Sequence, residues 1–152
     1  MPKDVNEIVR SLELEPHPEG GWYKRIYAHS TDMQSSNGTR PIATAIQYLL
    51  PAGLPNRWHR IDADEMWHHY KGDRLILETA DSSGPVSLKT EALGKDATNN
   101  EEPVRLVSAG VWQRAYVPEG GAYGWAFAGC TVSPGFLFEG WEVLEKGEAP
   151  WD

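Results

Sequence analysis

The sequence predicts an all-β fold, a jelly-roll barrel with one short helix near the N-terminus. Short segments rich in aromatic and β-branched residues recur along the chain, and turn residues separate them at the spacing expected of sandwiches and barrels. The 15 Gly and 11 Pro are spread along the chain, as many tight turns require. Because short antiparallel strands leave unpaired edges, a double-sheet jelly roll or a small closed barrel hides them best.

One segment alone has helical periodicity. Its apolar residues recur at i, i+3, i+4 and i+7, and they are Val5, Ile8, Val9 and Leu12. Asp4 precedes them and belongs to a residue type that caps helix N-termini. The helix is predicted to end before Pro16, because proline disfavours helical geometry in the residue ahead of it.

The rest of the chain is predicted to form strands joined by turns. In chain order the strands cover residues 22–27, 44–50, 57–61, 66–70, 75–79, 86–91, 104–107, 112–117, 123–130 and 136–142. Polar residues 30–39, which contain Asn37 and Gly38, are predicted to form an exposed loop or hairpin tip. Residues 94–103 are predicted to form a solvated connection.

Length and charge narrow the class of protein. A chain of 152 residues suits one domain, and we predict a single domain over residues 1–152. With 14 basic and 22 acidic residues the formal charge is −8, so nucleic acid and anionic membrane surfaces are not expected as partners. A small phosphorylated ligand is compatible with this charge, because a few arginines in one pocket outweigh a negative average.

Cysteine usage indicates a reducing compartment. Cys130 is the single cysteine and cannot form an internal disulfide, so we predict a cytoplasmic protein. The first residues contain no apolar stretch of signal-peptide length, and no run of about eighteen apolar residues occurs. We therefore expect neither a targeting segment nor a membrane span.

The chemistry is concentrated between Gly53 and Gly72. His59 and Ile61 share one face of a strand because side chains alternate with period two. A short turn over residues 62–64 then lets Glu65 begin the next antiparallel strand near His59. In a barrel that face is the interior, so an imidazole and a carboxylate converge on one point.

This spacing resembles the first signature of the cupin superfamily, whose Gly, His, Glu and Gly places are filled here by Gly53, His59, Glu65 and Gly72. The string SAGVWQRA resembles the second signature, with Gln113 in the place of a histidine. The resemblance implies the cupin double-stranded β-helix. A metal-binding cupin would have histidines where this chain has Ile61 and Gln113, so no cofactor is expected. Weak binding of a divalent metal by His59, Glu65 and Gln113 is the alternative.

A narrower resemblance covers nearly the whole chain. The strings PHPEGGWYKRIY, ATAIQYLL, WHRIDADEMWHHYKGD, SAGVWQRA and GCTVSPGFLFEGWEV occur in order and resemble the family known as DUF985 or Cupin_5. That resemblance implies a homodimeric jelly roll without the usual metal ligands. It also implies similarity in fold to the dTDP-4-keto-6-deoxyglucose epimerases, which work without a metal.

Ten residues are candidates for the site. The catalytic candidates are His59 as general base, Glu65 as base or as the group that orients His59, and Tyr48 as proton donor. The ligand-binding candidates are Glu19, Tyr23, Arg25, Arg57, Trp67, Trp112 and Gln113. Structural roles are weighed beside these: His59 as a hydrogen-bonded interior residue, Glu65 in an ion pair with Arg57 or Arg114, and both tryptophans as core packing.

The sequence leaves three functions open. The leading hypothesis is a small-molecule-binding cupin, with a polar nucleotide- or sugar-like ligand and metal-independent epimerase or isomerase chemistry. The second is a non-catalytic ligand-binding or structural module. The third is a metal-dependent oxygenase or isomerase, for which the chain has few good ligands.

Overall fold

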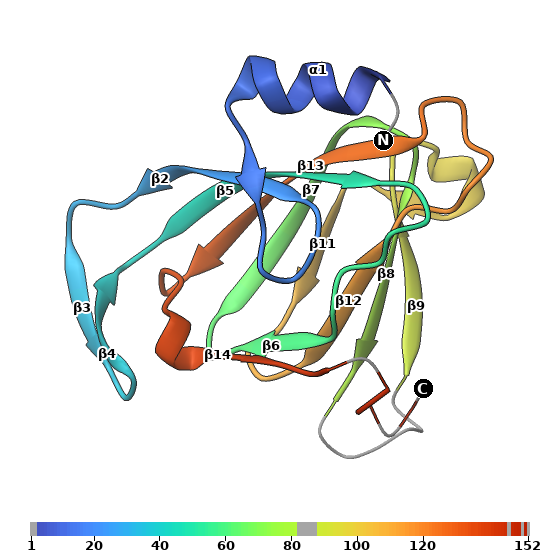
Figure 1. Cartoon of the computed structure of the whole chain (residues 1–152). Helices are drawn as coiled ribbons and strands as arrows, with labels where there is room; N and C mark the ends of the chain where they lie inside the picture. Colours follow the sequence, from blue (N-terminus) through green and yellow to red (C-terminus); the bar gives the residue numbers. More distant parts are fainter. Residues whose placement is uncertain (1–2, 82–87, 146, 150, 152) are drawn as a thin grey trace.

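The computed structural model describes residues 3–81, 88–145, 147–149 and 151. Two six-stranded sheets form the jelly roll that the sequence predicts (Figure 1). The first sheet contains, in spatial order, β1 (Glu15–Pro16), β2 (Trp22–Ala28), β5 (Thr44–Pro51), β13 (Trp125–Ser133), β7 (Asp64–Gly72) and β11 (Val104–Val107). The second contains β10 (Glu101–Glu102), β9 (Lys89–Leu93), β8 (Leu75–Ala80), β12 (Trp112–Tyr116), β6 (His59–Ile61) and β14 (Trp141–Val143). The barrel is therefore two facing sheets rather than one sheet closed on itself.

The inner faces of the two sheets divide between a packed core and a cavity. Along β5, Leu50 belongs to the core, Tyr48 to both the core and the cavity wall, and Ile46 and Thr44 line the cavity. Strand β13 follows the same order, with Ala128 in the core and Val132 at the cavity. Since alternate residues of a strand face the same way, the inner face of each strand contributes to the core at one end and to the cavity at the other. The core at one end thus fixes the strands that wall the cavity.

Helix α1 (Lys3–Leu12) packs its apolar stripe on the outer face of the first sheet. Val5 is fully buried against Leu49 and Trp125. The prediction of Asp4 as N-cap is wrong, because the helix includes Lys3 and Asp4 lies within its first turn. There its carboxylate still complements the positive end of the helix dipole. No helix among the described residues is long and apolar enough to cross a lipid bilayer.

Most predicted strands occur with bounds shifted by a few residues. Residues 30–39 contain most of a hairpin of β3 (Asp32–Ser35) and β4 (Gly38–Pro41). Residues 94–103 contain a short 3-10 helix, η2 (Ala97–Asn99), and strand β10. Of the strand predicted at 86–91, residues 86 and 87 lie outside the described residues. The strand predicted at 136–142 is largely wrong, because a 3-10 helix, η3 (Phe138–Gly140), occupies it and only β14 follows.

Candidate functional site

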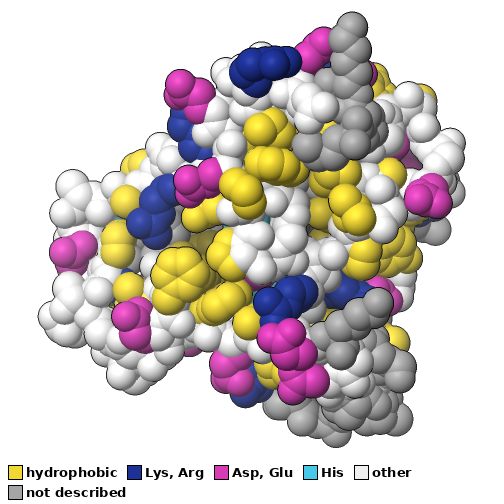
Figure 2. Space-filling model, in the orientation of Figure 1, with side chains coloured by type: hydrophobic (Ala, Val, Ile, Leu, Met, Phe, Trp, Pro, Cys, Tyr) yellow, Lys and Arg dark blue, Asp and Glu magenta, His cyan; other side chains and the backbone are white. Residues whose placement is uncertain are grey.

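A cavity of about 360 Å³ lies at the open end of the jelly roll. The first sheet, β6, the loop before β2 and the segment before β14 all contribute to it. Its lining residues are His17, Pro18, Glu19, Tyr23, Arg25, Thr44, Ile46, Tyr48, His59, Ile61, Glu65, Trp67, Cys130, Val132, Phe136, Leu137, Phe138 and Glu139. Figure 2 shows one face of the molecule, on which hydrophobic side chains gather in the middle and charged side chains lie around them.

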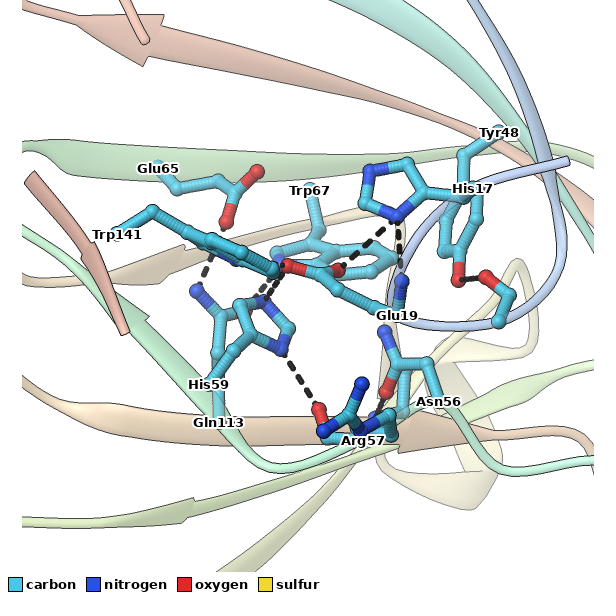
Figure 3. A network of polar contacts seen from close by, with 12 residues as sticks. His17, Glu19, Tyr48, Asn56, Arg57, His59, Glu65, Trp67, Gln113 and Trp141 are labelled. Atoms are coloured by element: carbon cyan, nitrogen blue, oxygen red, sulfur yellow. Dashed lines mark hydrogen bonds and ion pairs between the residues drawn. The ribbon is translucent and has the colours of Figure 1, made fainter. Parts of the chain in front are cut away.

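His59 is held in one orientation and one tautomer. It lies on β6, paired with Gln113 of β12 on one side and with Val143 of β14 on the other. Its Nδ1 lies 2.8 Å from the carbonyl oxygen of Arg57, which can only accept, so Nδ1 carries the hydrogen. The other ring nitrogen, Nε2, lies 3.3 Å from Oε2 of Glu19 (Figure 3). Nε2 and this carboxyl group therefore face each other, close enough for a proton to pass between them.

Glu19 reaches the cavity from the loop between β1 and β2. The loop is tight because Gly20 and Gly21 adopt positive φ angles of 108° and 79°, a backbone conformation that glycine tolerates best. A Cβ on Gly21 would lie 2.9 Å from the Leu49 carbonyl oxygen. The Glu19 carbonyl accepts a hydrogen bond from the backbone N–H of Arg57 at 2.8 Å. This bond ties the loop to the segment that leads into β6.

The protonation of this pair follows from its burial. His59 is 2% exposed and Glu19 is 7% exposed. Burial raises the pKa of Glu19 above its ordinary value, against the opposing effects of His17, the Trp141 hydrogen bond and Arg57. Burial lowers the pKa of His59, and the charge of Glu65 opposes that shift. Both pKa shifts favour a neutral carboxylic acid and a neutral imidazole over an ion pair of the two residues.

A second group of polar side chains surrounds Glu65 on β7. Nε1 of Trp67 donates to Oε1 of Gln113 at 2.8 Å, and Nε2 of Gln113 donates to Oε1 of Glu65 at 2.8 Å. The Cys130 thiol also lowers the pKa of Glu65. Burial raises the pKa of Glu65 to about 6, and the charges of His59 and Glu19 act in opposite directions on it. Glu65 thus titrates close to neutral pH.

Tyr48 does not offer a free hydroxyl. Its O–H donates to the carbonyl oxygen of Gly20, and burial raises its pKa well above the ordinary value. The phenol therefore fixes the glycine loop that carries Glu19. Its ring packs between His17, at a centroid distance of 5.4 Å, and Trp67, at 5.8 Å.

The structure brings most of the predicted site residues together. Those that line the cavity are His59, Glu65, Tyr48, Glu19, Tyr23, Arg25 and Trp67. Gln113 is fully buried behind the wall and acts through Glu65 and Trp67. His59 and Glu65 both line the cavity and interact electrostatically. The carboxylate 3.3 Å from the imidazole is that of Glu19, which the loop before β2 inserts beside it.

Two predicted ligand-binding residues lie outside the cavity. Arg57 precedes β6 and donates to the Leu144 carbonyl and to the Glu145 carboxylate, at 3.2 and 2.7 Å. Trp112 neighbours the inward Gln113 and therefore faces outward, where it packs with Trp58. The alternation along β12 could have identified Trp112 as an outward residue once Gln113 was assigned to the interior.

Two residues that the sequence analysis did not propose contribute to the site. His17 lines the cavity and accepts the backbone N–H of Glu19 on Nδ1, at 3.1 Å. Trp141 donates its Nε1 to Oε2 of Glu19 at 2.8 Å. His17 stands two positions before Glu19 next to a glycine pair, a local signal that could have drawn attention to it. Trp141 lies 122 positions from Glu19, and no local pattern indicates that contact.

The architecture and this site can be compared with known proteins. A family model described as Cupin superfamily (DUF985) matches residues 6–144. The chain belongs to this family, Cupin_5. The match covers most of the chain, as the order of its motifs predicts. No curated protein matches the Cupin_5 chain.

Solved structures extend the comparison. A hypothetical protein from Leishmania major is 26% identical, with a TM-score of 0.83 over 91% of this Cupin_5 chain and 86% of that chain. A protein from Shewanella oneidensis is 33% identical, with a TM-score of 0.81 over 92% and 84%. Oxalate decarboxylase from Bacillus subtilis, in a structure at pH 4.6, is 12% identical with a TM-score of 0.59 over 85% of this chain and 29% of its own. At that identity the last likeness concerns the fold alone.

The Cupin_5 chain does not present the metal ligands that the superfamily resemblance implies. Ile61 supplies no donor atom, and the orientation of the Gln113 amide is fixed because the indole N–H of Trp67 can only donate. The Gln113 oxygen therefore faces Trp67, and its nitrogen, which is not a metal ligand, faces Glu65. Among the described residues, no group of three or more His, Cys, Asp or Glu side chains is arranged to hold a metal ion. The donor set does not fit a metal ion.

Proposed function

We propose that this Cupin_5 chain binds a polar small molecule of nucleotide- or sugar-like chemistry in the cavity and transfers a proton on it without a metal ion. The observation that carries the proposal is the buried contact of His59 with Glu19, which places an imidazole nitrogen 3.3 Å from a carboxyl oxygen in the wall of the cavity. The cavity volume of about 360 Å³ falls in the range of small-molecule sites. Perturbed ionisable groups in such a cavity are typical of functional sites.

The His59–Glu19 pair supports acid–base chemistry. The two groups lie in contact, Nε2 of His59 being 3.3 Å from Oε2 of Glu19. When protonated, the pair can deliver the proton to a bound ligand, and without that proton it can accept one. The hydrogen bond from Nδ1–H of His59 to the Arg57 carbonyl keeps the other ring nitrogen, Nε2, directed toward Glu19. Epimerisation or isomerisation next to a carbonyl needs this ability, because a C–H proton is removed and one is returned.

The walls of the cavity support a ligand with a ring and a negatively charged group. Tyr23 lines the cavity, and Phe138, which is 59% exposed, lies at its rim. Both offer aromatic faces for stacking. Arg25 is exposed and also lines the cavity, where its guanidinium suits a phosphate or carboxylate. A nucleotide or a nucleotide-linked sugar combines these features.

Solvent-deuterium exchange tests the proposal. Purified protein is incubated in D₂O with a panel of nucleotide-linked keto-sugars and keto-sugar phosphates, and deuterium incorporation is followed by NMR and mass spectrometry. We expect incorporation into at least one compound, with a loss of about 100-fold or more in Glu19→Gln. The control is Glu142→Gln, since Glu142 is exposed and forms an ion pair with Arg60 away from the cavity. No incorporation into any compound would overturn the catalytic proposal.

A second candidate, a non-catalytic binding module, is favoured by one observation. The Tyr48 hydroxyl would be an obvious acid, but it is engaged with Gly20. Without that acid, the cavity would bind a ligand of matching shape and polarity and would not catalyse a reaction on it. Isothermal titration calorimetry separates the two functions. A compound that binds wild type without deuterium exchange, and binds His59→Ala with unchanged affinity, would support the module.

A further inference from the structure

Glu65 lies in the same cavity as the His59–Glu19 pair but comes from the other sheet. It is carried by β7 of the first sheet, whereas His59 is carried by β6 of the second. Its side chain is 8% exposed and lines the cavity. An epimerisation that removes a proton from one face of a carbon and returns one on the opposite face uses two groups, one on each side of the ligand. Tyr48 is not available as the second group, since its hydroxyl is engaged.

The hydrogen bonds around Glu65 have a fixed direction. The indole N–H of Trp67 can only donate, so it requires the oxygen of the Gln113 amide. The amide nitrogen of Gln113 then donates to Glu65. The buried Cys130 thiol of β13 also lines the cavity and lowers the pKa of the same carboxyl group. Donors of this kind stabilise a carboxylate and not a carboxylic acid.

These donors balance the burial of the carboxyl group. The titratable groups that face Glu65 are His59 from β6, Glu19 from the loop before β2 and Cys130 from β13. Burial favours the protonated acid, and Gln113 and Cys130 favour the carboxylate. A group balanced in this way exchanges protons near neutral pH.

We propose that Glu65 is the second proton-transfer group of the cavity, and that Gln113 and Cys130 are positioning residues that hold its carboxylate ready to accept a proton. This inference rests on the proposed function. A ligand C–H bond next to a carbonyl breaks, its proton passes to Glu65, and the electron pair stays on the ligand as an enolate. The His59–Glu19 pair gives a proton to the ligand. The cycle closes when Glu65 returns its proton to the pair through solvent.

A titration that needs no ligand tests the positioning role. The carboxyl carbon of Glu65 is followed by ¹³C NMR in labelled full-length protein and assigned by its absence in Glu65→Gln. In wild type we expect Glu65 to titrate at about 6. Cys130→Ala removes a donor and should raise the pKa by about 0.5, a threefold change in the ionisation constant. Cys130→Ser restores a donor and should return the pKa toward the wild-type value.

The control for these variants is Thr131→Ala, the neighbouring position whose hydroxyl contacts His68 instead. The same pKa in Cys130→Ala as in wild type would overturn the positioning role, and titration of Glu65 near 4.5 in wild type would overturn its role in proton exchange near neutral pH. Either result would leave the proposed function standing. Absence of deuterium exchange, by contrast, would remove the proposed function whatever the NMR titration gives.

Once a compound that exchanges deuterium is found, it tests the catalytic role. Glu65→Gln should lower the exchange rate by about 100-fold or more. Cys130→Ala should move the acidic limb of the pH–rate profile upward by the same amount as the NMR titration, whereas a residue needed only for folding would lower the rate at every pH. Undiminished exchange in Glu65→Gln would exclude Glu65 as a proton-transfer group.

Discussion

Replacing Gln113 with leucine should destabilise the protein strongly, although leucine has nearly the same size. Gln113 is fully buried and links Trp67 to Glu65 by two hydrogen bonds of 2.8 Å. The substitution leaves a buried indole N–H unpaired, at about 1–3 kcal/mol, and removes a hydrogen bond to a charged group, at about 1.5–3 kcal/mol. The free energy of unfolding should therefore fall by about 3–5 kcal/mol at pH 7.

Urea denaturation measures this loss. With a slope of about 2 kcal/mol per molar urea, the midpoint should fall by about 2 M. Trp67→Phe provides the double-mutant cycle, because it removes the N–H that Gln113→Leu leaves unpaired. The penalty of the double variant should be smaller than the sum of the single penalties by about 1 kcal/mol. A Gln113→Leu protein within about 0.5 kcal/mol of wild type, or strictly additive penalties, would refute the hydrogen-bond chain.

Three other perturbations follow from the structure. Ile61→His combined with Gln113→His should complete a metal site, so elemental analysis and calorimetry should detect stoichiometric Ni²⁺ or Mn²⁺ in the double variant; failure to bind would mean that these positions do not converge. Asp62→Asn should lower stability by about 2 kcal/mol at pH 7 because it weakens the pair with buried Arg40. The Arg40 hydrogen bond lowers the pKa of Asp62, so its contribution is present above about pH 4 and is lost as the pH falls through the folded-state pKa; an unchanged acid unfolding curve in Asp62→Asn would contradict this. The raised pKa of Glu65, about 6 against an ordinary 4.5, means that wild type should lose about 2 kcal/mol of stability through this group between about pH 4 and pH 7. Glu65→Gln should not show that loss, and equal pH dependence of the two proteins would show that Glu65 is not the cause.

The strands were predictable where the pattern of one segment decides the structure. The segment 104–107 has the predicted bounds, and 22–27 extends by one residue to Ala28. The segment 136–142 failed because its aromatic residues favour a strand locally but instead form the rim of the cavity. Phe136 is held there by its N–H donating to Thr44, at 3.0 Å and 92 positions away. Such a long-range contact overrides the local preference for a strand, and the sequence of residues 136–142 does not indicate it.

The part of the site that neighbouring residues determine was also predictable. The spacing of His59 and Glu65 places both in the cavity, because period-two alternation and a short turn follow from nearby residues. The further carboxylate beside the imidazole, Glu19, comes from a loop about 40 positions earlier and becomes its neighbour only when β2 pairs with β5. Arg57 was misplaced because a residue just before a strand has no fixed face, and its side chain joined Glu145 instead.

The hydrogen bond from Trp141 to Glu19 has a consequence for the timing of folding. It joins segments 122 positions apart, so on the ribosome the pocket stays incomplete until residue 141 has emerged. The small molecule that we propose for the cavity therefore cannot guide the early stages of folding of the nascent chain. Its influence begins only after synthesis of this region, when it draws the finished molecule toward the occupied state by mass action.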